Sequence, residues 1–147
     1  ATGTKSSGGV FTLAPVNEVE TYSASASAFP QQGNLITLKN QQWEVTHLTV
    51  PQKPYPRMFF AMGVADGYLS SGTGINLTVL IRDVPGQLAR FPNTGVEQST
   101  AVMNLGLVPA GADANVFLAV NGTGTFFITP NSLANRLNAL AFPVTAA

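Results

Sequence analysis

The sequence contains no cysteine among its 147 residues. Disulfide frameworks, thiol nucleophiles and cysteine-ligated zinc sites are therefore excluded. Histidine is nearly absent too, since His47 is the only one, and zinc sites want three or four nitrogen or sulfur ligands. We expect a fold held by its hydrophobic core alone, with no metal and no other cofactor.

Charged residues are also scarce. Seven Lys and Arg residues balance seven Asp and Glu residues, so that 10% of the chain is charged, where soluble proteins average about 25%. The basic residues are scattered along the sequence. Nucleic-acid binding normally needs them in a stripe or cluster, because phosphate contacts supply most of the affinity. We expect no nucleic-acid partner, and a neutral surface of this kind suits a protein packed in an assembly.

Long hydrophobic runs are missing, although 45% of the residues are hydrophobic. A membrane-spanning helix needs about 20 consecutive apolar residues, so no membrane partner is expected. The length fits one domain with a single core. Residues 1–30 are rich in Gly, Ser and Ala, and we interpret them as an extended arm that lies against another surface, with a frayed terminus as the alternative. The globular domain is then 31–147.

Short apolar segments with the alternation of β-strands recur through the chain. The clearest is 75–84, because every second residue from Ile75 to Ile81 is apolar and falls on one side. In 57–64, Met58, Phe60 and Met62 share one side in the same way. The other predicted strands are 43–50, 99–108, 114–120, 125–129 and 136–144, with weaker candidates at 9–16, 19–29 and 34–39.

Glycine and proline mark the turns that we predict between these strands. The segments 65–67, 71–74 and 121–124 each contain glycine, which supplies the positive φ that tight turns need. The last of them is expected to close the penultimate hairpin. Over 131–140 we favour a turn leading into a last strand rather than a helix. Turns every 8–12 residues or so between alternating strands predict an all-β fold, an antiparallel sandwich or barrel.

No set of catalytic residues stands out. A Ser-His-Asp triad would need His47 beside a serine and a carboxylate, but no G-x-S-x-G elbow is present, and we interpret His47 as a half-buried or surface residue of a strand. The seven acids lie in different turns and strands, so no pair is singled out for glycoside hydrolysis. Glycine-rich segments here lead into strands, whereas a phosphate loop leads into a helix. We predict that the chain is not an enzyme.

The C-terminal half has a recognisable order of elements. A strand ending in Arg82-Asp83 is followed by a Pro-Gly turn, a long loop and another strand. The phrase "VPAGADANV" (108–116) then precedes two apolar runs and a final segment, "RLNALAFP" (136–143). Over residues 42–144 this pattern resembles the jelly-roll surface proteins of tailed bacteriophages, which are broadly similar to the C1q and tumour-necrosis-factor sandwiches. The resemblance implies an antiparallel jelly-roll β-sandwich with an extended N-terminal arm.

The resemblance also implies a function. Because no fibre shaft precedes the head, it implies a non-enzymatic virion structural protein, a capsid decoration or cement protein made in the host cytoplasm and placed on the virion surface. The resemblance further implies that the chain forms a homo-oligomer, namely a trimer. It also implies that the partner is the major capsid protein or another virion protein. The predicted interaction residues are Phe11, Tyr22, Phe29, Phe126 and Phe127.

Two further points are open at the level of sequence. Phe126 and Phe127 point to opposite faces of a strand, so that one serves the core and the other a subunit contact, unless both are covered within the domain. The alternative function is a receptor- or glycan-binding knob of a phage fibre or tail. Its predicted ligand loop contains Tyr55, Asp66 and Tyr68. Alternatively, the Tyr68 ring covers the hydrophobic core.

Overall fold

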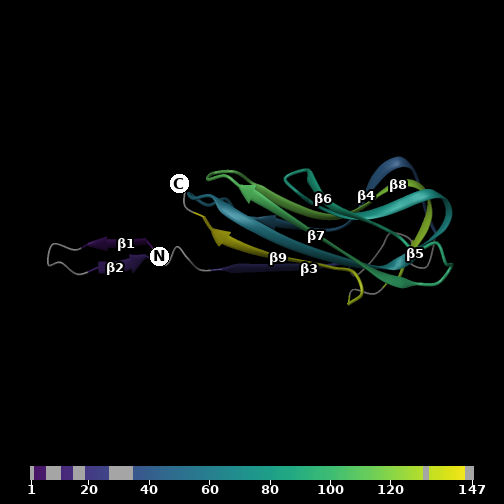
Figure 1. Cartoon of the computed structure of the whole chain (residues 1–147), viewed down its shortest axis with the longest axis horizontal. Helices are drawn as coiled ribbons and strands as arrows, with labels where there is room; N and C mark the ends of the chain where they lie inside the picture. Colours follow the sequence, from purple (N-terminus) through teal and green to yellow (C-terminus); the bar gives the residue numbers. More distant parts are fainter. Residues whose placement is uncertain (1, 6–10, 15–18, 27–34, 131–132, 145–147) are drawn as a thin grey trace.

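The computed structural model describes residues 2–5, 11–14, 19–26, 35–130 and 133–144 (Figure 1). Every element in these ranges is a β-strand, and every strand pair is antiparallel. Within the same ranges there is no helix able to cross a membrane. The strands are β1 (Thr2–Lys5), β2 (Phe11–Ala14), β3 (Glu20–Ser25), β4 (Ile36–Val50), β5 (Arg57–Ile81), β6 (Val84–Arg90), β7 (Gln98–Val108), β8 (Ala114–Ile128) and β9 (Arg136–Pro143). The predicted all-β class with antiparallel strands is confirmed.

The strands form two sheets. β1 and β2 pair with each other in a two-stranded sheet, which lies apart from the remaining strands (Figure 1). The other seven make one curled sheet with the order β3-β9-β5-β8-β4, and both β6 and β7 also pair with β5. Of the predicted arm, residues 1–30, the described parts are therefore the β1–β2 hairpin and β3, which pairs with β9 along its whole length.

β5 connects the two parts of the curled sheet. It is 25 residues long, and it changes partners at Gly67. Before Gly67 it pairs with β7 on one side and β9 on the other; after it, β5 pairs with β8 and then also with β6. We call β3, β9, β7 and the first part of β5 the β7–β9 half. The β4–β8 half consists of β4, β8, β6 and the second part of β5.

The two halves face each other across one hydrophobic core. A side-chain carbon added to Gly63 in the β7–β9 half would overlap Leu118 Cδ1 and would lie 3.0 Å from Val79 Cγ2 in the other half. Leu118, Val79 and Phe59 are all fully buried. Every second residue from Ile75 to Ile81 is buried, as the alternation of the sequence predicts. The sheet thus buries the apolar side of each half against the other.

Several boundaries follow from proline and turn chemistry. β4 ends at Val50, directly before Pro51, because proline cannot donate a ladder hydrogen bond. Arg82 and Asp83 connect β5 to β6 with φ values of 50° and 64°, as a two-residue hairpin turn with the right twist requires. The Pro-Gly dipeptide expected to turn here lies inside β6. As predicted, a turn within 131–140 leads into a last strand, β9, which begins at Arg136.

Three of the predicted glycine turns are wrong. The segments 65–67 and 71–74 lie inside β5, and 121–124 lies inside β8. The two apolar runs on either side of 121–124 therefore form one continuous strand, and the expected penultimate hairpin does not exist.

The glycines in these segments bend the strands instead of reversing them. Gly72 and Gly124 have φ values of 115° and 151°, and the β5–β8 register shifts between Gly72 and Gly74. A side-chain carbon on Gly124 would lie 2.6 Å from the carbonyl oxygen of Ser71. Glycine inside a strand commonly marks such a bulge or close backbone approach. At these glycines a positive φ does not reverse the chain but lets β5 and β8 bend together within the β4–β8 half, with their backbones in close contact.

Candidate functional site

One side of the β7–β9 half faces away from the core and is nevertheless apolar. Its residues alternate along each strand with residues that point into the core. We call this surface the outer face. Its residues are Thr21, Ser23, Met58, Phe60, Met62, Met103, Leu105, Leu107, Asn138, Leu140 and Phe142.

Backbone pairing arranges these residues in rows across four strands. Phe60 pairs with Leu105 of β7 and with Leu140 of β9, and Met62 occupies the same place in the next row. Paired residues of antiparallel strands project to the same side of the sheet. The two central rows are Thr21–Leu140–Phe60–Leu105 and Ser23–Asn138–Met62–Met103. The outer face is therefore one continuous surface.

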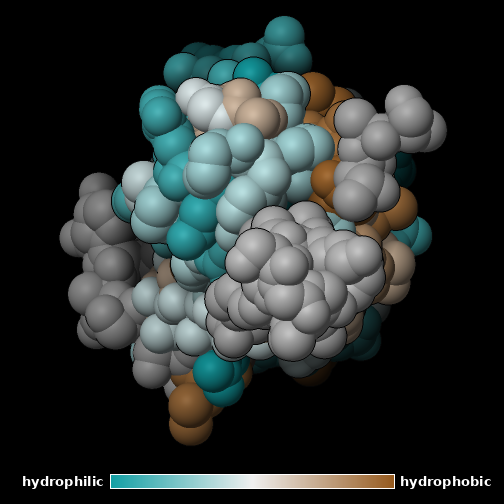
Figure 2. Space-filling view, turned by 90° about the vertical axis from the view of Figure 1, so that its left-hand side faces the viewer, coloured by the Kyte–Doolittle hydropathy of each residue, from teal (hydrophilic) through white to brown (hydrophobic). Residues whose placement is uncertain are grey.

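Large apolar side chains on this face are open to solvent. Leu105 is 60% exposed, Leu107 53%, Met62 48%, Met103 46% and Leu140 42%. All three methionines of the chain lie on the outer face. Seen from the end of the molecule, hydrophobic residues gather on the right-hand side, and a smaller group lies at the lower edge (Figure 2). Single exposed apolar residues are ordinary, but a contiguous apolar surface marks an interaction site.

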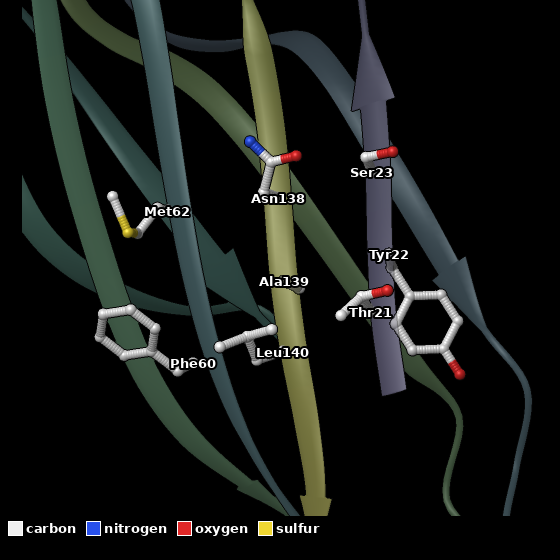
Figure 3. Close-up of a pocket in the computed structure, with 8 residues that line it drawn as sticks. All are labelled: Thr21, Tyr22, Ser23, Phe60, Met62, Asn138, Ala139 and Leu140. Atoms are coloured by element: carbon white, nitrogen blue, oxygen red, sulfur yellow. The ribbon is translucent and has the colours of Figure 1, made fainter. Parts of the chain in front are cut away.

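A hollow of about 370 Å³ opens on the outer face above β9. Thr21 and Ser23 of β3 border it on one side, and Phe60 and Met62 of β5 on the other. Asn138 and Leu140 stand between these two borders (Figure 3). The lining is mostly apolar, with hydroxyl and amide groups from β3 and β9 as its polar atoms. Such a lining accepts an uncharged side chain.

On the other side of β5, strand β7 forms a ridge of exposed side chains. Its outward residues Met103, Leu105 and Leu107 follow one another along the strand. Beyond this ridge lies a second hollow, of about 330 Å³, which Leu105 and Leu107 share with Val84 of β6 and with Arg82 of the β5–β6 turn. Val84 is itself 63% exposed, so that the apolar surface continues past the edge of the β7–β9 half.

The outer face carries no charged side chain. The first charged residue next to its rows is Arg136, which pairs with Val64 in the row beyond Asn138 and Met62. Around the central rows all polar groups are neutral hydroxyls and the Asn138 amide. A surface of this kind offers a partner contact area and a few hydrogen bonds, and it offers no ion pairs.

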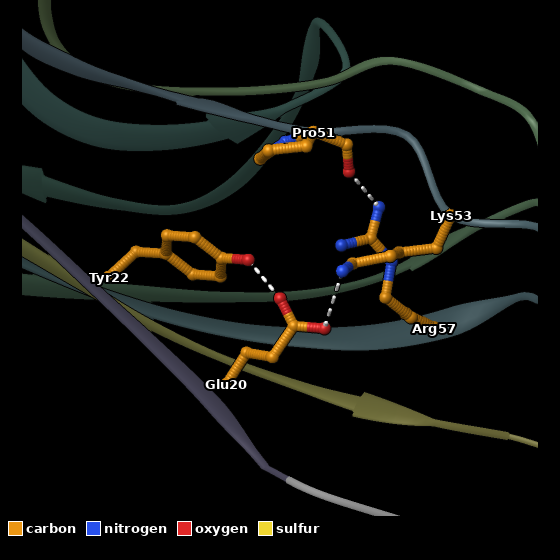
Figure 4. Close-up of polar contacts among 5 residues, drawn as sticks. All are labelled: Glu20, Tyr22, Pro51, Lys53 and Arg57. Atoms are coloured by element: carbon orange, nitrogen blue, oxygen red, sulfur yellow. Dashed lines mark hydrogen bonds and ion pairs between the residues drawn. The ribbon is translucent and has the colours of Figure 1, made fainter. Parts of the chain in front are cut away.

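A polar cluster lies beneath the edge of the outer face, on the inner side of β3. The Tyr22 hydroxyl donates a hydrogen bond to the Glu20 carboxylate, whose other oxygen lies 3.9 Å from Lys53 Nζ (Figure 4). Burial raises the pKa of Tyr22 to about 12, and the hydrogen bond to Glu20 acts in the same direction. The cluster ties β3 to the segment before β5, and so it holds the Thr21 border of the hollow in place.

Arg57 completes this region at the start of β5. Its side chain is buried, and its Nη2 donates a hydrogen bond of 2.8 Å to the carbonyl oxygen of Pro51. The guanidinium also lies over the Phe59 ring, 5.0 Å from the centroid, in a cation–π contact. Its Nε and Nη1 have no hydrogen-bond partner among the described residues. These contacts fix the turn of the chain into β5.

Among the predicted interaction residues, the three whose side chains the structure describes do not form one group. Phe126 is fully buried, with the Phe91 ring stacked at 6.2 Å and the Trp43 ring edge-on at 6.0 Å. Phe127 is half-buried on the opposite side of β8, and Tyr22 lies in β3. Phe29 lies outside the described residues, and Phe11 is in β2, of which the structure describes only the backbone.

The expected ligand loop around Asp66 and Tyr68 is wrong, because both residues lie inside β5. The Asp66 carboxylate accepts hydrogen bonds from Thr129 Oγ1 at 2.8 Å and from Ser99 Oγ at 3.4 Å. Tyr68 stacks on Phe127 with ring centroids 5.3 Å apart. Tyr55 is half-buried in the segment before β5. The Asp66 carboxylate thus links β5 to Ser99 of β7 and to Thr129, directly after β8.

His47 lies on the surface of β4, as predicted. Its side chain is 53% exposed, and Nδ1 is 3.1 Å from the Glu44 carboxylate. The Phe117 ring lies next to it, with centroids 6.0 Å apart. Throughout the ranges that the structure describes, no three side chains of the metal-binding types come together.

Sequence reasoning missed the outer face as a site. It recognised that Met58, Phe60 and Met62 share one side of a strand, but alternation alone does not tell which side faces the core. The available signal was that both sides of 57–64 and 101–108 are largely apolar. Strands with this pattern are covered on both faces, and here the fold covers only one.

Comparison with known proteins assigns no family to the chain. No protein-family model matches it, and a search of curated proteins returns no significant match.

Proposed function

We propose that this chain is a non-enzymatic structural protein of a virion surface, a capsid decoration protein that works by packing against its neighbours. The observation that carries the proposal is the uncharged outer face, with five large apolar residues each at least 42% exposed. Apolar surfaces of this extent are characteristic of protein–protein contacts. The low content of charge, 10% of residues, agrees with a molecule whose neighbours stay close.

We propose a jelly-roll sandwich as the finer description of the fold. Two sheet halves that face each other across one core support it. The resemblance of 108–116 and of the final strand to phage surface proteins adds to that support. In this proposal residues 1–30 attach the domain to the major capsid protein or to another virion protein.

A receptor- or glycan-binding knob is the second candidate function. The stacked pair of Tyr68 and Phe127 favours it, because both rings are only half-buried and aromatic residues often anchor binding partners. In this alternative the protein sits at the tip of a fibre or tail, and the outer face packs against the fibre.

Immunogold labelling of virus particles tests the proposal. Antibodies raised against the purified chain are applied to particles produced from the genome that carries its gene. Gold over the capsid shell is the expected result. Gold confined to the tips of fibres or tails would favour the knob, and particles without any label would contradict both functions.

A further inference from the structure

We infer that the outer face is the contact between two copies of this chain, related by a two-fold axis that runs along β5. This inference deepens the proposed function, because it rests on the outer face being an assembly surface and names the partner. It differs from the trimer that the family resemblance implies, and measurement of the oligomer decides between them.

The chemistry of the face restricts what can cover it. Neither central row contains a charged residue, and Arg136 lies in the adjoining row, paired with Val64 and Ser25. A partner that brought a charged group onto the central rows would bury it without a counter-charge in those rows, and an unpaired buried charge is strongly unfavourable. The partner must therefore present an uncharged, largely apolar surface. A second outer face meets this requirement.

The shape of the face is self-complementary. The hollow lies above β9, between Thr21 on β3 and Phe60 on β5, whereas the ridge with Leu105 at its centre is on β7. Since β9 and β7 flank β5, hollow and ridge lie on opposite sides of it, each one strand spacing of about 4.8 Å away. A two-fold axis along β5 places the ridge of each copy over the hollow of the other, which is how an isologous interface is built.

The size of the face sets the strength of the contact. Four strands span about 19 Å and seven residues along a strand about 23 Å, which gives a footprint of about 440 Å² on each copy. A specific interface needs roughly 500 Å² from each partner. Side-chain relief and the adjoining Val84, 63% exposed, add area to the flat footprint. We therefore expect a dimer at the weak end of the specific range, with a micromolar dissociation constant.

Sedimentation equilibrium of the full chain tests the inference. The mass should rise with concentration from 15.3 kDa towards twice that value. Leu105→Asp should raise the dissociation constant by about tenfold or more, because it brings a carboxylate into the apolar contact. Leu88→Asp is the matched control. Leu88 is 56% exposed against 60% for Leu105, but it lies on β6 in the β4–β8 half, and its replacement should leave dimerisation unchanged.

Chemical cross-linking tests the position of the axis without bringing a charge onto the face. Because the chain has no cysteine, Met62→Cys and Leu88→Cys each introduce one thiol. Facing sheets lie about 10 Å apart, so a short bifunctional maleimide can join two thiols close to the axis. Met62→Cys should give a cross-linked dimer, and Leu88→Cys should remain uncross-linked.

Three results would overturn the inference. They are a monomer at every concentration up to the limit of solubility, a trimer, and equal cross-linking from the two cysteine variants. A monomer whose antibodies nevertheless label capsids would refute the pairing of two copies and leave the proposed function standing. A dimer whose antibodies label no particle would support the pairing and contradict the virion role.

Discussion

The two halves of the curled sheet turn the same kind of surface towards each other and very different surfaces outward. On the β4–β8 half, the outward positions of β4 and β8 include Glu44, His47, Thr49 and Asn115, which are all exposed. On the β7–β9 half, the corresponding positions hold Met and Leu. Folding requires only the inner sides to be apolar, and both halves satisfy that requirement. The apolar outer face is therefore not explained by the core, and we attribute it to a partner.

β5 shows the contrast between the two halves within a single strand. Its inner residues are apolar along most of its length, from Phe59 to Ile81. On the opposite side, the first part exposes Met62, whereas in the second part Asn76 is half-buried and Thr78 and Leu80 are buried. An exposed apolar surface on the side away from the core is therefore confined to the part of β5 that lies in the β7–β9 half.

The largest effect is expected in the shared core. Leu118→Ala removes a fully buried side chain and should lower the free energy of unfolding by about 2–5 kcal/mol. Leu105→Ala removes the same atoms from the outer face and should change the stability of the monomer by about 0.5 kcal/mol or less. Urea titration at a protein concentration below the dimer dissociation constant measures both. Equal losses for the two variants would remove the distinction between inner and outer sides.

The next effect concerns the bulge where β5 and β8 lie close together in the β4–β8 half. Gly124→Ala should cost about 3 kcal/mol, because its φ of 151° is strained for alanine and the new methyl group would lie 2.6 Å from the Ser71 carbonyl oxygen. Gly111→Ala is the control, with a φ of 73° and no atom within 4 Å of the added carbon; it should cost about 1 kcal/mol. Urea midpoints give the difference, and a Gly124 variant no less stable than the Gly111 variant would contradict the close backbone approach of β5 and β8 at this bulge.

A smaller effect should follow when the outer face is made to resemble the opposite surface. Replacing Met103, Leu105 and Leu107 together by threonine keeps residues that favour strands and removes the apolar ridge. We expect the monomer to retain its stability within about 1 kcal/mol and to lose its tendency to dimerise. Circular dichroism, urea unfolding and sedimentation check the three parts. A triple variant that unfolds would show that the ridge belongs to the fold itself.

The smallest effect is a pH dependence at the edge of the β7–β9 half. The pKa of Tyr22 is raised from 10.0 to about 12 in the folded protein. Between these values the unfolded chain has released the tyrosine proton and the folded chain still holds it, so stability present below pH 10 is lost as the pH rises towards 12. Tyr22→Phe lacks this contribution. The urea midpoint of the wild type should therefore fall more steeply than that of Tyr22→Phe over this range, and parallel curves would argue against a coupled Tyr22–Glu20 pair.

Much of the secondary structure could be predicted from sequence because alternation is local. The inward side of 75–81, the end of β4 at Val50 and the position of the last strand all depend on neighbouring residues. The glycines at 72 and 124 show the limit, since a positive φ is needed both in a tight turn and in a strand that passes close to another. Only the partner strand decides which of the two occurs, and that partner is distant in sequence.

The candidate site was harder to predict for a related reason. The sequence shows that Met58, Phe60 and Met62 lie together, but their exposure depends on whether another sheet covers them. That depends on β5 changing partners at Gly67, which no local pattern reveals. The interaction residues predicted from the sequence were aromatic instead, and one of them, Phe126, is buried in the core.

The central claim is that the outer face becomes covered when two copies meet, and methionine oxidation tests it most directly. All three methionines lie on this face, so each oxidation site reports on it. The protein is treated briefly with hydrogen peroxide at concentrations well below and well above the dimer dissociation constant, and sulfoxide is quantified at Met62 and Met103 by peptide mass spectrometry. The account predicts that oxidation of both residues slows severalfold at high concentration. Equal rates at both concentrations would contradict it.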